Sequence, residues 1–114
     1  MKKVLILGAG PLQVPAIKTA KELGCYVFCC DYNPEAIGFS FADKRKVIST
    51  TDIKAVLAYA ASEKVDYVIT SASDAPVRTA AFVSEELNLP YSINYENAKA
   101  ATLKNIMRDR LKAY

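Results

Sequence analysis

The chain has 114 residues, 52% of them hydrophobic, and a net charge of +3. This size and composition predict one globular domain with a real core, and the apolar residues are too dispersed for a membrane span of about 20 residues. Histidine is absent, which excludes Ser-His-Asp and Cys-His catalysis and histidine-based metal sites.

The distribution of charge bears on nucleic-acid binding, and the N-terminus bears on the compartment of the protein. Residues 99–114 carry five basic groups and one acidic group, so the positive excess lies in this segment. A basic segment this short is typical of a solvated helix face, and we expect no nucleic-acid partner. The N-terminus leads directly into a strand-like run without a cleavable leader, which predicts a cytoplasmic protein.

Apolar runs typical of parallel strands buried on both faces alternate with helical patterns or loops. The predicted strands cover residues 3–7, 26–31, 46–48 and 66–70, and a short fifth strand covers 90–93. This alternation predicts an α/β fold, a three-layer open parallel sheet with Rossmann-like topology and right-handed crossovers.

Three helices with apolar faces lie between these strands. The first begins near Pro11 and ends at Gly24, with an inward face of Leu12, Ala16, Ile17, Ala20 and Leu23. The second covers 52–62, capped by Thr51, with an inward face of Ile53, Val56, Leu57, Ala60 and Ala61. The third covers 74–87, with an inward face of Val77, Ala80, Ala81, Ser84 and Leu87.

The C-terminal segment reads as helical as well, and it divides the chain into residues 1–94 and a helical connection over 95–114. Asn94 caps a helix over 95–101, and a further helical face runs from 103 to the end, formed by Leu103, Ile106, Met107, Arg110 and Leu111. A finished domain offers this last face no partner.

The three cysteines lie within six residues of one another, at Cys25, Cys29 and Cys30. In a strand, Cys25 and Cys29 are separated by about 13 Å, and Cys29 and Cys30 point to opposite faces, so the three do not chelate one metal. We expect them to pack as small hydrophobic residues, and the odd number suits a reducing compartment.

A glycine turn follows the first strand. Gly8 and Gly10 allow the backbone to turn tightly where free helix N–H groups favour a phosphate or carboxylate. Pro11 and Leu12 complete the turn, and Gln13 stands where the dinucleotide fingerprint has its third glycine. The alternative is a tight turn without a ligand.

Asp31 ends the second strand, 21 residues after Gly10. This is close to the spacing at which an acidic residue binds a ribose hydroxyl in dinucleotide folds. The alternative is an aspartate that stabilises the turn before Asn33 and Pro34.

The segment from Thr70 to Asp74 follows the fourth strand, at the same edge of the sheet as Gly10 and Asp31. Ligands of open α/β sheets bind at this edge, so Ser73 and Asp74 are binding candidates as well as candidate helix caps. Paired carboxylates, a thiol–base pair and a metal cluster are all missing from the sequence pattern, and we expect no bond-breaking chemistry within this chain.

The sequence resembles the N-terminal, pre-ATP-grasp domain of ATP-grasp ligases, the family of biotin carboxylase, the carbamoyl-phosphate synthetase large chain and the purine-pathway ligases. The motifs that carry the resemblance are VLILGAGPLQ at 4–13, DYNPEA at 31–36, FAD at 41–43, ISTTD at 48–52, VDYVIT at 65–70, LP at 89–90 and AKAATLK at 98–104. Pro11 and Pro15 resemble the pattern of a carbamoyl-phosphate-synthetase-like subgroup.

The resemblance implies a substrate-binding domain for a small carboxylate or phosphorylated substrate, inactive without the ATP-grasp module of the same polypeptide, which supplies the ATP and Mg²⁺ sites. The glycine loop would hold the acceptor substrate, and Asp31, Ser73 and Asp74 would face or flank the same pocket. Lys104 matches a basic residue that touches ATP phosphates, and the last helix would pack against the ATP-grasp module.

Two other functions remain open at this stage. Gly8, Gly10 and Asp31 also suit an NAD(P)-binding Rossmann domain of an oxidoreductase, or a regulatory binding module. A structural domain that forms a homodimer through its exposed C-terminal helix is the third alternative.

Overall fold

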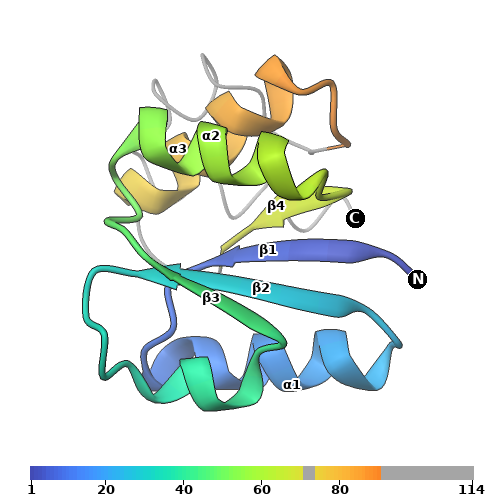
Figure 1. Ribbon diagram of the computed structural model, residues 1–114, viewed down its shortest axis with the longest axis vertical. Helices are drawn as coiled ribbons and strands as arrows, with labels where there is room; N and C mark the ends of the chain where they lie inside the picture. Colours follow the sequence, from blue (N-terminus) through green and yellow to red (C-terminus); the bar gives the residue numbers. More distant parts are fainter. Residues whose placement is uncertain (71–73, 91–114) are drawn as a thin grey trace.

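The computed structural model describes residues 1–70 and 74–90. In these ranges the chain forms a parallel sheet with the strand order β3-β2-β1-β4 (Figure 1). The strands are β1 (Lys3–Leu7), β2 (Tyr26–Asp31), β3 (Lys44–Val47) and β4 (Tyr67–Ile69). The predicted bounds of β1 and β2 are confirmed, and β1 lies between β2 and β4.

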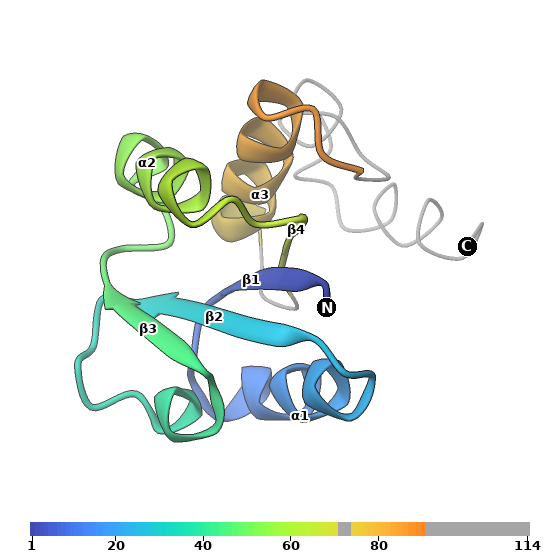
Figure 2. The ribbon, with the colours of Figure 1, turned by 45° about the vertical axis from the view of Figure 1, so that its right-hand side comes forward.

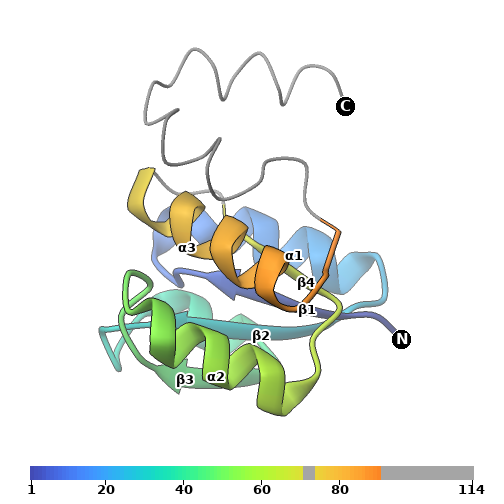
Figure 3. The same cartoon turned by 90° about the horizontal axis from the view of Figure 1, so that it is seen from above.

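Helical segments cover both faces of the sheet, as the predicted three-layer fold requires (Figures 1 and 2). One face carries η1 (Pro11–Gln13), α1 (Val14–Glu22) and η2 (Ile37–Phe41), which are connections around β1, β2 and β3. The other face carries α2 (Ile53–Glu63) and α3 (Asp74–Glu86), which lie side by side in Figure 3. The α/β, Rossmann-like architecture is thus confirmed.

Two separate cores result from the alternation of side chains along the strands. Leu5 and Leu7 of β1 pack under α2 and α3, whereas Val4 and Ile6 pack under α1 and η2. The neighbouring cysteines follow the same rule: Cys30 lies in the first core and Cys29 in the second, and both are buried. The prediction that they pack on opposite faces is confirmed.

Residues next to the helices explain where α2 begins and where α1 and α2 end. Asp52 precedes α2, and its Oδ1 accepts a hydrogen bond from the N–H of Ala55 at 3.2 Å, so the predicted cap at Thr51 is wrong by one residue. Lys64 ends α2 in the left-handed conformation, with φ 55°. Gly24 follows α1 with φ +84°, a conformation that glycine adopts without strain.

Several predicted details differ from the structure. Strand β3 is exposed over all four residues, because it forms an edge of the sheet and its Lys44, Arg45 and Lys46 face solvent. Leu12 and Leu23 were expected in the core and are 83% and 76% exposed. On α2, Tyr59 is buried and Ala61 is exposed.

The exposure of Leu12 and Leu23 has a local cause, since η1 is a 3₁₀ turn, and α1 itself begins at Val14 and ends at Glu22. The face that a continuous helix from Pro11 would give therefore does not extend to Leu12 or Leu23. The strand expected over 90–93, the helices over 95–101 and 103–114 and the boundary at residue 94 lie at the end of, or beyond, the described residues.

Candidate functional site

The loop after β1 lies at the carboxyl edge of the sheet, between the ends of β2 and β4. Gly8 has φ +101°, in the region that favours glycine, and its N–H donates to the carbonyl of Cys30 at 2.8 Å. The backbone then turns through Ala9 and Gly10 into η1. The sequence prediction of a tight β–α turn at these glycines is confirmed.

Gln13 folds back over this turn and is only 8% exposed. Its Oε1 accepts a hydrogen bond from the N–H of Gly10 at 2.9 Å. A Cβ added to Gly8 or Gly10 would lie 3.2 Å from atoms of this side chain. Gln13, which replaces the third glycine of the dinucleotide fingerprint, therefore fills the space over the loop. It also accepts the hydrogen bond that the N–H of Gly10 could give to a ligand.

Asp31 ties the end of β2 to the same loop. Its Oδ2 accepts a hydrogen bond from the N–H of Ala9 at 2.9 Å, and its Oδ1 accepts one from the N–H of Asn33 at 3.0 Å. The second contact is the Asx turn of the capping interpretation. Asp31 is partly exposed, so its carboxylate still reaches the surface at this edge.

The loop at residues 8–10 therefore has few free hydrogen-bond donors for a phosphate. The N–H groups of Gly8, Ala9 and Gly10 all donate to atoms of the protein itself. Residues 8–13 include no basic side chain, and a carboxylate sits beside them. The surface left open consists of exposed Pro11 and Leu12 next to the acceptor oxygens of Asp31, which suits an amine, amide or hydroxyl donor better than an anion.

Gly38 of η2 packs against the glycine loop, although the sequence pattern gave no prediction for this residue. Its N–H donates to the carbonyl of Ala9 at 2.6 Å. A Cβ at this position would lie 2.6 Å from that oxygen and 2.8 Å from Cδ1 of Ile17. A glycine in the middle of an otherwise bulky stretch, Ile37-Gly38-Phe39, is the pattern that could have predicted this close approach.

The structure brings together Gly8, Gly10, Gln13 and Asp31, with Pro11 and Leu12 at the surface beside them. Thr70, at the end of β4, donates from Oγ1 to the carbonyl of Leu7 at 3.0 Å, which joins the third strand end to the loop. Asp74 begins α3. Ser73 and Lys104 lie outside the described residues.

Cys29 and Cys30 are buried free thiols whose surroundings oppose ionisation. Burial, with added effects of the neighbouring thiol and of Asp31, raises the pKa of Cys29 to about 12, and burial raises the pKa of Cys30 to about 12 as well. Such thiols stay protonated at neutral pH. Residues 1–70 and 74–90 contain no group of three or more His, Cys, Asp or Glu side chains that could hold a metal ion. None of the helices in these ranges has the length and hydropathy to cross a membrane.

Comparison with protein families gives a match over residues 1–88 to the family described as "Alanine dehydrogenase/PNT, C-terminal domain". The chain belongs to this family. The match covers the whole described fold, from β1 to the end of α3.

Curated relatives extend the likeness to nearly the whole chain. The formate-dependent phosphoribosylglycinamide formyltransferase of Parasynechococcus marenigrum is 29% identical over 111 residues, which are 97% of this chain and 27% of that enzyme. The enzyme of the same name from Synechococcus sp. WH7803 is 30% identical over 110 residues, again 27% of its length. The chain therefore spans about a quarter of the length of these relatives.

Solved structures agree with this assignment. The phosphoribosylglycinamide synthetase from Anaerococcus prevotii superimposes with a TM-score of 0.79 and 28% identity, over 99% of this chain and 29% of that one. The N5-carboxyaminoimidazole ribonucleotide synthetase from Thermotoga maritima has a TM-score of 0.72 and 22% identity, over 99% and 31%, which shows the shared fold. These relatives are ATP-grasp ligases, so the predicted resemblance to the N-terminal domain of that family is confirmed.

Proposed function

We propose that this chain is the acceptor-binding domain of an ATP-grasp carboxylate–amine ligase with carbamoyl-phosphate-synthetase-like chemistry, and that it is inactive alone. The observation that carries the proposal is the extent of the matches: three of the relatives named above align with 97–99% of this chain but with only 27–31% of their own length. The remaining two thirds of such an enzyme would hold ATP and Mg²⁺, for which the described residues offer no ligand cluster.

The reaction of the complete enzyme would activate a carboxylate with ATP. The γ-phosphoryl group passes to the carboxylate oxygen and releases ADP; the amine then attacks the acyl carbon, and inorganic phosphate leaves as the amide forms. This chain would bind the amine-bearing acceptor and hold it at the carboxyl edge of the sheet. Lys104 would contact the phosphates of ATP, and Ser73 and Asp74 would flank the acceptor.

The geometry of the loop supports an acceptor that donates hydrogen bonds. The Asp31 carboxylate reaches the surface, and the backbone donors that would cradle a phosphate are already used by Asp31, Gln13 and Cys30. An ammonium or amide group next to Asp31 would form a charge-assisted hydrogen bond, and the exposed Pro11 and Leu12 would cover its apolar side. Any phosphate of the substrate would then bind away from residues 8–10.

Two measurements test this function directly. An immunoblot of source cells with antibody against this chain should show a band several-fold larger than 12.5 kDa, and a band at 12.5 kDa would contradict the proposal. The purified chain should hydrolyse ATP with Mg²⁺ no faster than a denatured control.

Binding of the acceptor is measurable by NMR titration with phosphoribosylglycinamide, the compound in the names of the relatives. We expect shifts that include the loop and Asp31, with affinity in the roughly millimolar range for an isolated domain. Asp31→Asn should weaken binding about tenfold. Glu35→Gln, in the same loop, is the matched control and should leave it unchanged, because only the backbone N–H of Glu35 takes part in the turn. Circular dichroism shows whether each variant is folded.

A second candidate, an NAD(P)-binding domain, is favoured by the family match over residues 1–88 and by the place of Asp31 at the end of β2. The Gln13 side chain and the internally bonded donors of the loop argue against it, because a pyrophosphate needs those N–H groups. Titration with NAD⁺ and NADH discriminates between the two. Micromolar binding that Asp31→Ala weakens would favour the dinucleotide domain over an acceptor-binding domain.

A further inference from the structure

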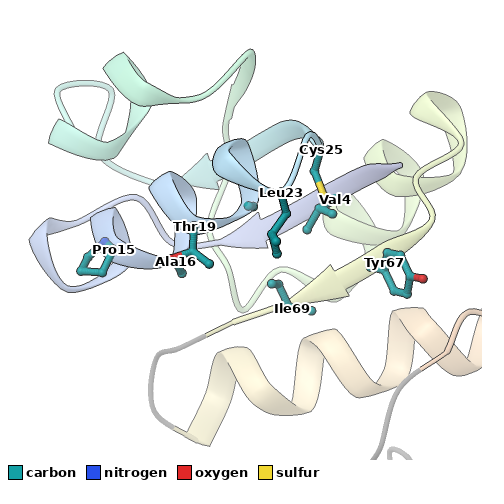
Figure 4. A pocket seen from close by; sticks show the side chains of 9 residues that line it. Val4, Pro15, Ala16, Thr19, Leu23, Cys25, Tyr67 and Ile69 are labelled. Atoms are coloured by element: carbon teal, nitrogen blue, oxygen red, sulfur yellow. The ribbon is translucent and has the colours of Figure 1, made fainter. Parts of the chain in front are cut away.

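The face of the sheet that carries α1 and η2 has two hollows of different chemistry. One is an apolar groove of about 480 Å³ between α1 and β4, where Leu23 and Ile69 point toward each other above Val4 (Figure 4). None of the described residues that line this groove is charged. The other hollow, of about 430 Å³, lies at the opposite edge of the sheet, next to β3, and combines apolar walls with charged groups.

This second hollow, the η2 pocket, lies between the segment after β2, η2 and β3. It is lined by residues 34–37, Phe39, Ser40 and Arg45. Phe39 is buried, whereas Ile37 is 54% exposed and gives the pocket an apolar rim. The lining includes neither Asp31 nor the loop at residues 8–13, so the η2 pocket is separate from the candidate functional site.

Arg45 belongs to this pocket because side chains alternate along β3. It pairs in register with Cys29, whose side chain lies in the core under α1 and η2. Lys46, the next residue, pairs with Cys30 of the core under α2 and α3. The two neighbouring cations therefore lie on opposite faces of the sheet.

The guanidinium group of Arg45 is held in place but not neutralised. It lies over the ring of Phe39, 5.4 Å from the ring centroid, and its Nη1 donates to the carbonyl oxygen of Pro34 at 3.5 Å. Lys44 of the same strand pairs with Glu63, but in the described part of the chain no carboxylate forms an ion pair with Arg45. A guanidinium stacked on a ring keeps its other N–H donors in the planar fork that matches a carboxylate.

The other lining residues limit the charge and shape of the ligand. Glu35 is exposed and lines the same pocket. Its carboxylate would repel a dianion such as phosphate more strongly than a singly charged carboxylate. Ile37 and Phe39 offer apolar contact for a short hydrocarbon chain. The pocket therefore suits a monocarboxylate with a small apolar tail.

We propose that the η2 pocket binds a small monocarboxylate, with its oxygens on the Arg45 guanidinium and its apolar tail against Ile37 and Phe39. A carboxylate that accepts two N–H bonds from one guanidinium forms a charge-assisted, directional pair. This site does not depend on the proposed function, because it involves neither Asp31 nor residues 8–13.

NMR titration of the full 114-residue chain with 3-methylbutanoate tests the site. We expect saturable shifts of the backbone N–H signals of Ser40 and Arg45, with a dissociation constant of about 1–10 mM. 3-Methylbutanamide has the same shape without the charge and should bind at least about fivefold more weakly. Inorganic phosphate should also bind more weakly than 3-methylbutanoate, because of Glu35.

Variants of β3 separate the pocket from the overall charge of the strand. Arg45→Gln should weaken binding of 3-methylbutanoate at least about tenfold. Arg45→Lys keeps the charge but loses the planar fork, and should weaken binding about threefold to fivefold. Lys46→Gln is the matched control: it removes the same charge one residue away, on the other face of the sheet, and should change binding less than about twofold.

Any of the following results would overturn the proposal. Equal weakening by Arg45→Gln and Lys46→Gln means that net charge, and not the pocket, attracts the carboxylate. Equal binding of the amide or of phosphate means that Arg45 does not select a monocarboxylate. Shifts centred on Ala9 and Asp31 place the ligand at the acceptor loop, and the absence of saturable shifts up to about 50 mM means that no site exists.

The ligand comparisons use the unmodified chain, so they decide the matter even if Arg45→Gln disturbs the packing of Phe39. Failure of the acceptor titration at Asp31 would leave the shifts at Ser40 and Arg45 unaffected, because the two sites share no residue. The two proposals therefore fail separately.

Discussion

The two faces of the sheet are closed in different ways, although the same strands supply both. Under α2 and α3, Leu5 and Leu7 belong to one continuous apolar core that includes Phe28 and Tyr59, whose rings meet edge to face at 6.1 Å. Under α1 and η2 the core is smaller and a groove remains open beside β4. The difference comes from the connections, because two helices of 11 and 13 residues cover one face and a nine-residue helix with a 3₁₀ segment covers the other.

Polar contacts compensate for part of that difference on the α1 face. Asp43, after η2, accepts hydrogen bonds from Lys21 of α1 at 2.5 Å and from the N–H of Val27 at 2.8 Å. Burial acts to raise the pKa of Asp43, but these hydrogen bonds outweigh it and hold the pKa below its usual range. The contact from Gly38 to Ala9 joins η2 to the glycine loop in the same way. Polar contacts join the sheet to α2 as well, since Lys44 of β3 pairs with Glu63 at 3.2 Å, but on the α1 face such contacts also shape the candidate site.

The largest effect is expected from opening the packed face. Leu5→Ala removes a fully buried side chain from the α2/α3 core and should lower the free energy of unfolding by about 2–5 kcal/mol. Leu12→Ala, at an 83% exposed position of η1, should change it by less than about 0.5 kcal/mol. Urea unfolding of both variants gives the comparison, and equal losses would contradict the difference between the faces.

The next effect tests the close contact on the α1 face. Gly38→Ala places a Cβ 2.6 Å from the Ala9 carbonyl oxygen, a backbone atom that has little room to move, and should cost roughly 3 kcal/mol. Gly24→Ala is the matched control: its φ is +84° but nothing lies within 4 Å, so backbone strain of about 1 kcal/mol is expected. Thermal unfolding measures both, and a smaller loss for Gly38→Ala would show that η2 moves freely on the loop.

Cys29 and Cys30 lie in the two different cores, and each should make the stability of the chain depend on pH. Both have a pKa raised from 9.0 to about 12 in the folded chain, so the stability they provide is complete below pH 9 and is lost as pH rises from 9 to 12. At pH 10.5 the loss is on the order of 2 kcal/mol per thiol. Cys29→Ala and Cys30→Ala should each remove one part of this alkaline loss, which urea unfolding between pH 7 and 10.5 measures. A variant with the same pH dependence as the parent chain would show that its thiol is not buried in solution.

The smallest effect concerns polar atoms enclosed by the packed face. Burial raises the pKa of Tyr59 to about 12, and among the described residues neither its hydroxyl nor that of Ser84 has a hydrogen-bond partner. Tyr59→Phe and Ser84→Ala should therefore leave stability unchanged or raise it by up to about 1 kcal/mol. A loss above that amount in calorimetry would reveal a partner for that hydroxyl outside the described residues.

Local pattern predicted the features that depend on near neighbours in sequence. The bounds of β1 and β2 and the turn at Gly8 follow from apolar runs and glycine positions, and the structure confirms them, whereas α1 ends at Glu22, two residues before the predicted end at Gly24. The candidate residues Gly8, Gly10, Gln13 and Asp31 were also found in this way, and they do meet at one edge of the sheet.

Contacts between segments that are distant in sequence could not be predicted from local pattern. The glycine pattern left a phosphate site open, because it does not reveal that Asp31 and Gln13 already bind the loop donors. The exposure of β3 depends on its place at the sheet edge, and that place is a property of strand order. Gly38 escaped notice because its importance depends on Ala9, 29 residues away in the chain.

The sequence by itself determined the α/β alternation, the positions of the turns and the kinship with ATP-grasp ligases, because short-range periodicity and local motifs carry that information. The tertiary structure alone decided which backbone donors remain available at the loop and which face of the sheet is left open. Hydrogen-bond satisfaction and burial are properties of groups brought together by folding, so the same glycine turn serves as a phosphate cradle or as an internally bonded loop according to the side chains that close over it.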